Sequence, residues 1–344
     1  MMPIGVAVVG AGYWGPNLVR NFLGCPETDL RWICDLSVDA ARRALGPRST
    51  VMITEDLDDV LSDPEVIAVA VATPVRTHAE VTLACLEAGK HVLVEKPLAM
   101  SISEGEKLLA AAERAGLTLM CDHTYCYTPA VRKIRELIEQ GDVGDVHYVD
   151  SVRINLGLVQ SDVDVFWDLA PHDLSILDFI LPAGFEPVSV AAQGADPIGA
   201  GHACVGYLTL PLPGDAIAHA HVNWLSPVKV RTTIIGGSRR ILVWDDLHPT
   251  QRLTVYDSGV HLNGTVDLEQ RRDALISYRT GDMVAPALSE TEALWGVVRE
   301  FVASIRERRP AATDGESGMR VVRILEAATR SLGRDGATER IGEA

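Results

Sequence analysis

The sequence predicts two halves of different fold class: an α/β half with a doubly wound parallel sheet, then an α+β half with a large open, mostly antiparallel sheet. Up to about residue 122, apolar runs alternate with amphipathic helix patterns, as in a doubly wound sheet. Beyond it, several strand patterns are joined by hairpin signals such as Pro213-Gly214-Asp215 and Gly236-Gly237. We therefore expect two domains, residues 1–122 and 123–344.

The composition is that of a globular protein, with 47% apolar and 23% charged residues among 344. The net charge of −16 argues against a nucleic-acid partner, which needs a basic patch. No basic region precedes the first apolar run and no apolar stretch approaches the ~18 residues of a membrane span, so we expect neither a signal peptide nor a membrane partner. The six scattered cysteines lack zinc spacing, which predicts buried thiols in a reducing cytoplasm and no metal site.

The first element is a valine-rich strand that breaks into a Gly-x-Gly-x-x-Gly turn and then a helix. Gly10 allows the tight turn, Gly12 lets the backbone approach a pyrophosphate, and Gly15 permits close helix–strand packing. Tyr13 and Trp14 lie within the same turn. The helix that follows directs free N–H groups and a partial positive charge at the phosphates. A structural glycine turn in another α/β fold is the alternative.

The second strand, residues 30–34, ends in Asp35, about 20 residues beyond Gly15, as in the Rossmann fingerprint. A carboxylate there accepts hydrogen bonds from the adenosine ribose hydroxyls and repels a 2′-phosphate. The next two residues supply no arginine, although Arg42 and Arg43 follow within two helical turns. The sequence therefore predicts NAD as the cofactor, with NADP less favoured.

The other elements of the first half follow in order. Helix patterns run from after residue 35 to 45 and over 55–61, 78–88 and 101–116, and strand patterns cover 51–53, 66–71, 91–94 and 117–121. Ser101 and Glu104 form a capping box at the start of the last helix. The loops after the strands at 66–71 and 91–94 belong to the carboxyl edge of the sheet, where ligands bind in open α/β folds.

Lys96 is the first catalytic candidate, because it follows the strand at 91–94 directly, between Glu95 and Pro97. A lysine at that edge would stand near the nicotinamide ring and hydrogen-bond the substrate oxygen that changes between alcohol and carbonyl. A partly desolvated lysine can also shuttle the proton of that oxygen. A surface lysine after a strand is the alternative if Lys96 stands alone.

Asp168 and His172 lie four residues apart, on one face of a predicted helix. Pro171 places the expected start of this helix nearby, with Asp168 at the N-cap or just before it. His172 can take an alcohol proton as hydride leaves the carbon, and Asp168 can orient the ring or bind a second hydroxyl. A capping aspartate beside a histidine satisfied in the core is the alternative.

The second half predicts a helix at 129–139, a strand at 146–154, strands between 188 and 256, and helices at 289–306 and 317–332. Its open sheet has one face free of its own helices, and apolar residues suggest that this face is not fully polar: Val222, Trp224, Leu225 and 232–235. Such a patch is covered either by another subunit or by helices of the same chain, and both alternatives stay open. Asn263-Gly264-Thr265 predicts a hairpin turn.

These motifs together resemble the glucose-fructose oxidoreductase / inositol dehydrogenase / MocA (Gfo/Idh/MocA) family over nearly the whole chain. The residues that carry the resemblance are the glycine turn at 10–15, Gly89-Lys90-His91-Val92 to Glu95-Lys96-Pro97, Asp168 with His172, and residues 310–315. The resemblance implies NAD(P)-dependent chemistry at a secondary alcohol of a sugar, inositol or sugar nucleotide. It makes Lys96, Asp168 and His172 the acid–base set.

Further cofactor contacts follow from the resemblance, at positions Thr73, Pro74, His78, Glu95 and Lys96. The family's open antiparallel sheet often mediates assembly, which implies a homodimer or homotetramer through the C-terminal sheet. The chain departs from the family at residues 170–171, directly before the histidine, where many members have Gly or Ser.

Five more residues are candidates for substrate binding. His123 and Tyr125 follow the sixth strand, where core packing is an equal interpretation. Arg153 and Asn155 alternate to one face of the first strand of the second half, where Arg153 binds an anionic group or forms an ion pair. Trp167 offers an apolar face to a sugar ring or belongs to the core.

The sequence therefore predicts an NAD-dependent sugar or sugar-nucleotide dehydrogenase, in which Lys96 and the Asp168–His172 couple act on one carbinol beside the nicotinamide. An NAD-dependent glycosidase of the same fold is one alternative. A dinucleotide-binding sensor without turnover is another, although intact Lys96, Asp168 and His172 argue against it.

Overall fold

The computed structural model describes residues 2–46, 50–181, 187–263 and 275–342. The chain divides into two compact units. The first comprises residues 1–128, 174–179 and 290–326, and the second comprises 129–173, 180–289 and 327–344. The sequence predicts a single boundary between residues 122 and 123, whereas here a late segment of the chain groups with the N-terminal unit.

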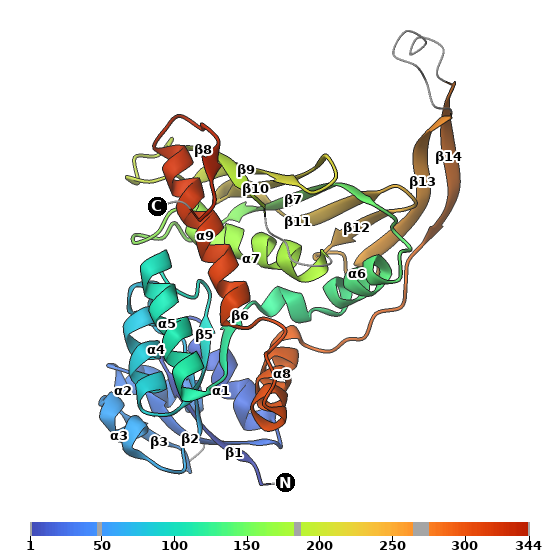
Figure 1. Cartoon of the computed structure of the whole chain (residues 1–344). Helices are drawn as coiled ribbons and strands as arrows, with labels where there is room; N and C mark the ends of the chain where they lie inside the picture. The colour runs from blue at the N-terminus through green and yellow to red at the C-terminus, as the bar shows by residue number, and fades with distance from the viewer. Residues whose placement is uncertain (1, 47–49, 182–186, 264–274, 343–344) are drawn as a thin grey trace. The chain divides into compact units, whose positions relative to one another are not determined.

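A parallel sheet forms the centre of the first unit (Figure 1). In the described part of the chain its six strands are arranged in the order β3-β2-β1-β4-β5-β6, and every pair is parallel. The strands are β1 (Ile4–Val9), β2 (Thr28–Cys34), β3 (Met52–Thr54), β4 (Ala68–Val71), β5 (His91–Glu95) and β6 (Leu119–Asp122). The order reverses between β1 and β4, so the doubly wound Rossmann sheet is confirmed.

Helices connect these strands, and Figure 1 shows α4 and α5 side by side. They are α1 (Gly15–Gly24), α2 (Val38–Leu45), α3 (Leu57–Ser62), α4 (His78–Glu87) and α5 (Ile102–Ala115), with the short 3₁₀ helices η1 (Val75–Thr77) and η2 (Thr124–Tyr127). The Ser101 hydroxyl accepts the Glu104 N–H at the start of α5, as predicted. The Glu104 carboxylate reaches back to the N–H of Met100, and left-handed Gly116 ends the helix.

Helices α8 (Ala293–Glu307) and α9 (Gly315–Leu332) explain why the units do not follow a single boundary. Val298 and Phe301 of α8 are buried in the same apolar cluster as Val8 of β1 and Phe22 of α1. Just before α8, Glu292 forms an ion pair with Arg20 of α1 at 2.6 Å. The first unit therefore includes α8 and the first part of α9, to residue 326.

The second unit is built on a large sheet with strand order β14-β13-β12-β11-β7-β10-β9-β8-β15 in the described part of the chain. The strands are β7 (Val146–Leu156), β8 (Ser189–Ala195), β9 (Val205–Leu212), β10 (Ala216–Asn223), β11 (Leu225–Gly237), β12 (Ile241–Asp245), β13 (Leu253–Asn263), β14 (Leu275–Val284) and β15 (Glu339–Arg340). Within the described part of this second sheet only β7 and β10 pair in parallel, which confirms a mostly antiparallel sheet. The predicted turn at Asn263-Gly264-Thr265 follows β13, and residues 264–265 lie outside the described residues.

The second unit also contains α6 (Pro129–Glu139) and the first part of α7 (Val165–Ile180). Val222, Trp224 and Ile235 are buried, so these residues belong to the covered face of the sheet. The other face carries Tyr207 of β9 and Ile217 of β10, which are 45% and 49% exposed. Val222, Trp224 and Ile235 are thus covered within the chain, which was one of the two alternatives. The exposed Tyr207 and Ile217 are not among the residues that the sequence pattern singles out.

The six cysteines are buried, and the described part of the chain contains no disulfide between them. None of the described helices combines the length and the apolar character that crossing a membrane requires.

Candidate active site

The glycine turn leaves room for a ligand at one position and packs tightly at two others. Gly10 has a φ of 96°, and a Cβ there would lie 2.5 Å from the carbonyl oxygen of Ala72. A Cβ on Gly15 would overlap the carbonyl of Gly10, so the start of α1 can approach the strand only without a side chain. By contrast, apart from Gly12 and its two neighbours in the chain, no heavy atom of the described residues lies within 4 Å of the Cβ position of Gly12. This open space is what the backbone approach of a pyrophosphate requires.

Asp35 is held beside the glycine turn by two backbone groups. Its Oδ2 accepts the N–H of Ala11 at 2.6 Å, and its Oδ1 accepts the N–H of Ser37 at 2.7 Å. Each carboxylate oxygen keeps a further lone pair for a hydroxyl donor. An open Gly12 and a fixed carboxylate fit the pyrophosphate and ribose of a dinucleotide. Tyr13, also in the turn, is almost fully exposed.

His78 ties together the loops that follow β4 and β5. Its Nδ1 lies 2.9 Å from the carbonyl oxygen of Pro97, and its Nε2 lies 2.9 Å from that of Thr73. Burial lowers the pKa of His78, although both carbonyl contacts act to raise it. A neutral imidazole donates to only one of the two carbonyls. Thr73 and Pro74 are thereby positioned at the carboxyl edge of the sheet, where their cofactor contacts stay a prediction.

Lys96 follows β5 directly, and the Lys96–Pro97 peptide bond is cis. Glu95, the last residue of β5, pairs in register with Asp122, the last residue of β6. Asp122 accepts hydrogen bonds from Thr124 Oγ1 and, more weakly, from the indole N–H of Trp14. Asp122 is not among the site residues that the sequence predicts. The signal was available, because a carboxylate at the end of a buried strand is the same pattern that singled out Asp35.

His123 comes next in the chain and is 1% exposed. Neither ring nitrogen has a hydrogen-bond partner among the residues that the structure describes. Burial, and then the charges of Lys96 and Arg320, lower the pKa of His123 to about 3, so the ring is neutral. A buried imidazole with open hydrogen-bonding positions is consistent with the predicted substrate contact. Tyr125 lies on η2 and is half-buried.

Helix α7 carries the acid–imidazole couple of the second unit, and it begins earlier than the sequence predicts. The Asp164 carboxylate caps it by accepting the N–H groups of Phe166 and Trp167 at 2.9 and 3.0 Å. The predicted start near Pro171 is therefore wrong. Pro171 lies inside the helix, where it removes the hydrogen bond to the Trp167 carbonyl without ending the helix.

Asp168 and His172 lie one turn apart on α7, and both are half-buried. The Asp168 Oδ2 accepts the indole N–H of Trp224 at 3.0 Å. Trp224 is 1% exposed and follows β10, and its ring meets that of His202 edge-on at 6.0 Å. Trp224 fixes one carboxylate oxygen of Asp168. The sequence does not predict this role, because no local pattern links residues 56 positions apart.

Arg153 and Trp167 make contacts within the second unit. The Arg153 guanidinium forms a buried pair with Asp173, with N–O distances of 3.0 Å for Nε to Oδ2 and for Nη2 to Oδ1. The buried Trp167 indole donates to Thr329 at 3.0 Å. The contact of Arg153 is the ion pair, and the contact of Trp167 is the core packing, that were the alternatives to substrate binding. Substrate binding by Arg153, Asn155 and Trp167 stays a prediction.

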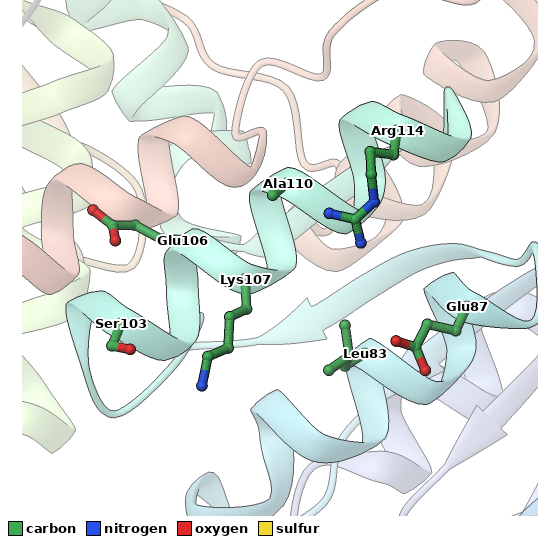
Figure 2. Close-up of a pocket in the computed structure, with 7 residues that line it drawn as sticks. All are labelled: Leu83, Glu87, Ser103, Glu106, Lys107, Ala110 and Arg114. Atoms are coloured by element: carbon green, nitrogen blue, oxygen red, sulfur yellow. The ribbon is translucent and has the colours of Figure 1, made fainter.

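A surface pocket between α4 and α5 lies outside this set (Figure 2). It is lined by Leu83, Glu87, Ser103, Glu106, Lys107, Ala110 and Arg114. Its two carboxylates and two cations balance, and it contains none of the predicted site residues. Within residues 2–46, 50–181, 187–263 and 275–342, no group of three or more His, Cys, Asp or Glu side chains is arranged to hold a metal ion.

Comparison with known proteins gives matches in both halves of the chain. Residues 4–123 match the oxidoreductase family with an NAD-binding Rossmann fold, and residues 131–242 match the GFO/IDH/MocA C-terminal domain. The inositol 2-dehydrogenase of Rhizobium meliloti strain 1021 is 26% identical over 344 aligned residues, which cover 96% of this chain and 97% of that protein.

Two crystal structures are similar over 94% or more of this chain. One, described as an oxidoreductase from Magnetospirillum magnetotacticum MS-1, is 31% identical with a TM-score of 0.79, and the match covers 94% of this chain and 99% of that one. The other is GenD2 from gentamicin A biosynthesis in complex with NAD, which is 26% identical with a TM-score of 0.81, covering 100% and 97%. Since both halves match one family in sequence and the fold agrees throughout, the chain belongs to the Gfo/Idh/MocA family of NAD-binding oxidoreductases.

Proposed function

We propose that this chain transfers hydride between NAD and a secondary alcohol or ketone on a polyhydroxylated ring, such as a sugar, an inositol or a nucleotide sugar. One relative is an inositol 2-dehydrogenase, and GenD2, from the biosynthesis of gentamicin A, binds NAD. The observation that carries the proposal is the place of Lys96, directly after β5 at the carboxyl edge of a dinucleotide-binding sheet. Ligands of open α/β sheets bind at this edge.

In this proposal the side chains of the chain hold the substrate and move its proton. When bound, NAD supplies the hydride acceptor or donor. The Lys96 ammonium hydrogen-bonds the substrate oxygen and fixes its position. His172 accepts the hydroxyl proton during oxidation and returns it during reduction. Asp168 orients the His172 ring, while the indole of Trp224 keeps the carboxylate in place.

The direct test is to titrate the NAD-loaded protein with a panel of inositols, free sugars, sugar phosphates and nucleotide sugars. Reduction of the cofactor is followed by absorbance. A substrate of the proposed class gives stoichiometric ketone and reduced cofactor. Release of an aglycone without net cofactor reduction would instead identify a glycosidase. Tight NAD binding without turnover across the whole panel would favour a sensor.

Replacement of the proposed active-site lysine tests its role. We expect Lys96→Ala to lower turnover of the substrate found in the panel by roughly 10²-fold or more, since it removes the group that handles the substrate oxygen. NAD affinity, measured by calorimetry, should stay near wild type. Lys107→Ala, at an exposed lysine of α5, is the matched control and should leave both quantities unchanged. Wild-type turnover in Lys96→Ala would exclude the assignment.

We propose in addition that the chain assembles as a homodimer or homotetramer through the less covered face of the second unit's sheet. The exposed Tyr207 and Ile217 on neighbouring strands β9 and β10 support this, because apolar side chains on an open sheet face are commonly buried by a second copy. Six buried thiols and a described region without disulfides fit a reducing cytoplasm as the compartment.

A further inference from the structure

Two carboxyl groups meet beside Lys96 at the edge of the first unit's sheet. Glu95 and Asp122 are register partners at the ends of β5 and β6. As register partners on adjacent parallel strands, their side chains lie on the same side of the sheet, and each carboxyl acts on the pKa of the other. Asp122 is almost fully buried, and the Oε1 atom of Glu95 is enclosed. Ionised carboxylates only accept hydrogen bonds, so two of them in contact repel unless one carries a proton.

The hydrogen-bond donors around the pair are too few for two carboxylates. Asp122 accepts from Thr124 Oγ1 at 2.6 Å and from Trp14 Nε1 at 3.4 Å. Glu95 Oε2 accepts the backbone N–H of Lys96 at 3.3 Å, whereas no described residue donates to Glu95 Oε1. A proton on Glu95 removes this shortage. It makes Glu95 a donor to Asp122, which keeps its two other bonds.

Burial raises the pKa of both carboxyls, whereas their interaction with each other raises one pKa and lowers the other. Burial, and then the neighbouring Asp122, raise the pKa of Glu95 well above its usual value. Burial also raises the pKa of Asp122, although hydrogen bonds from Glu95 and Thr124 act to lower it. Asp122 already accepts hydrogen bonds from Thr124 and Trp14, so a proton on Glu95 that is donated to Asp122 keeps both of these bonds and leaves the negative charge on Asp122.

The neighbouring cysteine, tyrosine and histidine are neutral, so they do not change the net charge of the carboxyl pair. Burial raises the pKa values of Cys121 and Tyr127 well above their usual ranges, so both side chains are neutral. His123 is neutral as well, with its pKa lowered to about 3 chiefly by burial. Lys96 and Arg320 are the cations whose charges act on these groups, and Arg320 is itself paired with Asp178.

We propose that Glu95 and Asp122 share one proton, and that Asp122 is a positioning residue that holds Glu95 as a neutral acid, so that the pair presents a single negative charge to Lys96. The shared proton is independent of the catalytic assignment, whereas its effect on Lys96 rests on the proposed function. Loss of this proton at alkaline pH places a second negative charge beside Lys96. The ammonium is then drawn toward the carboxylates and away from the substrate oxygen.

Thermal unfolding of Glu95→Gln and Asp122→Asn at about pH 5 and about pH 8 tests the shared proton. In either variant the amide donates an N–H to the remaining carboxylate, so no proton is needed. The pKa of Glu95 in the folded protein lies above its unfolded value of about 4.3. The proton on Glu95 therefore stabilises the folded wild type fully below about pH 4.3. This stabilisation is lost as the pH rises through the pKa of Glu95 in the folded protein. We expect the Tm of each variant, relative to wild type, to rise by a few degrees from the lower to the higher pH.

Asp173→Asn is the matched control, because Asp173 is a buried carboxylate that forms a bidentate ion pair with Arg153. This control should lower the Tm at both pH values. If Glu95→Gln and Asp122→Asn lower the Tm at both pH values as much as Asp173→Asn does, an amide N–H cannot take the place of the shared proton and the proposal fails. It fails equally if their Tm relative to wild type does not change with pH.

The effect on Lys96 is tested separately, with the substrate found in the panel. We expect the wild-type kcat/KM to fall on an alkaline limb, and the limb to move to higher pH by a unit or more in Glu95→Gln and Asp122→Asn, which keep one negative charge and no shared proton. An unmoved limb overturns the positioning role of Asp122. The Tm measurements need no substrate. They therefore test the shared proton even if the proposed function is wrong, so failure of one proposal is distinguished from failure of the other.

Discussion

At the residue scale, we expect Asp35 to determine whether the site prefers NAD or NADP. Its carboxylate is fixed by the N–H groups of Ala11 and Ser37, so it cannot easily move away from an added 2′-phosphate. We expect Asp35→Ala to weaken NAD binding and to relax discrimination against NADP. Affinities for both cofactors, measured by fluorescence titration, check this without any substrate. The control Asp39→Ala, at an exposed aspartate of α2, should change neither affinity. A wild-type preference for NADP would contradict this interpretation of Asp35.

Residues at strand ends could be found from the sequence, because the strand itself marks the place. Asp35 and Lys96 both follow apolar runs, and the structure places them at the edge of the sheet where ligands bind. Contacts between distant segments could not be found in this way. The hydrogen bond from Trp224 to Asp168 and the pair between Arg153 and Asp173 depend on the tertiary arrangement of strands and helix.

Helix α7 shows how one capping side chain determines where a helix that carries candidate site residues begins. Asp164 fixes the first turn, and Asp168 and His172 follow on that helix. Replacing an N-cap aspartate with alanine typically costs about 1 kcal/mol. We expect Asp164→Ala to lower the free energy of unfolding by about that amount, measured with urea.

The matched control for this cap is Asp164→Asn, which keeps the accepting oxygen and should lose much less stability. Equal losses in both variants would show that the carboxylate charge, not the cap, supports the helix. The sequence predicted α6 at 129–139, because its proline stands at the start of the helix and a glycine follows its end. The same rule misplaced the start of α7, since Pro171 is inside the helix and Asp164 supplies the true cap.

Assembly is a property of the whole molecule, and the exposed sheet face gives it a sharp test. We expect Ile217→Lys to shift the protein toward the monomer in light scattering after size exclusion, because a charge replaces an apolar residue on the proposed interface. Ile198→Lys is the matched control, since Ile198 is also exposed but lies outside the strands. A wild-type monomer, or equal dissociation in both variants, would exclude this face as the interface.

The two-part organisation could be predicted from alternating patterns, but the membership of each part could not. Helix patterns at 289–306 and 317–332 are visible in the sequence, yet nothing in them says which sheet they cover. The apolar side chains of α8, such as Phe301, complete the core that Phe22 and Val8 begin near the N-terminus. Long-range packing of this kind leaves no local signature, so a single boundary was the natural expectation.

This late completion has a consequence for biosynthesis. While the chain leaves the ribosome, Phe22 and Val19 of α1 emerge long before the helix that seals them has been translated. The nascent N-terminal part therefore presents an apolar surface throughout most of its synthesis. Because residues 290–326 belong to the same compact unit as the N-terminal part, we expect folding of this unit to be completed only after they have been synthesised, and the unfinished polypeptide to bind chaperones that shield apolar surface.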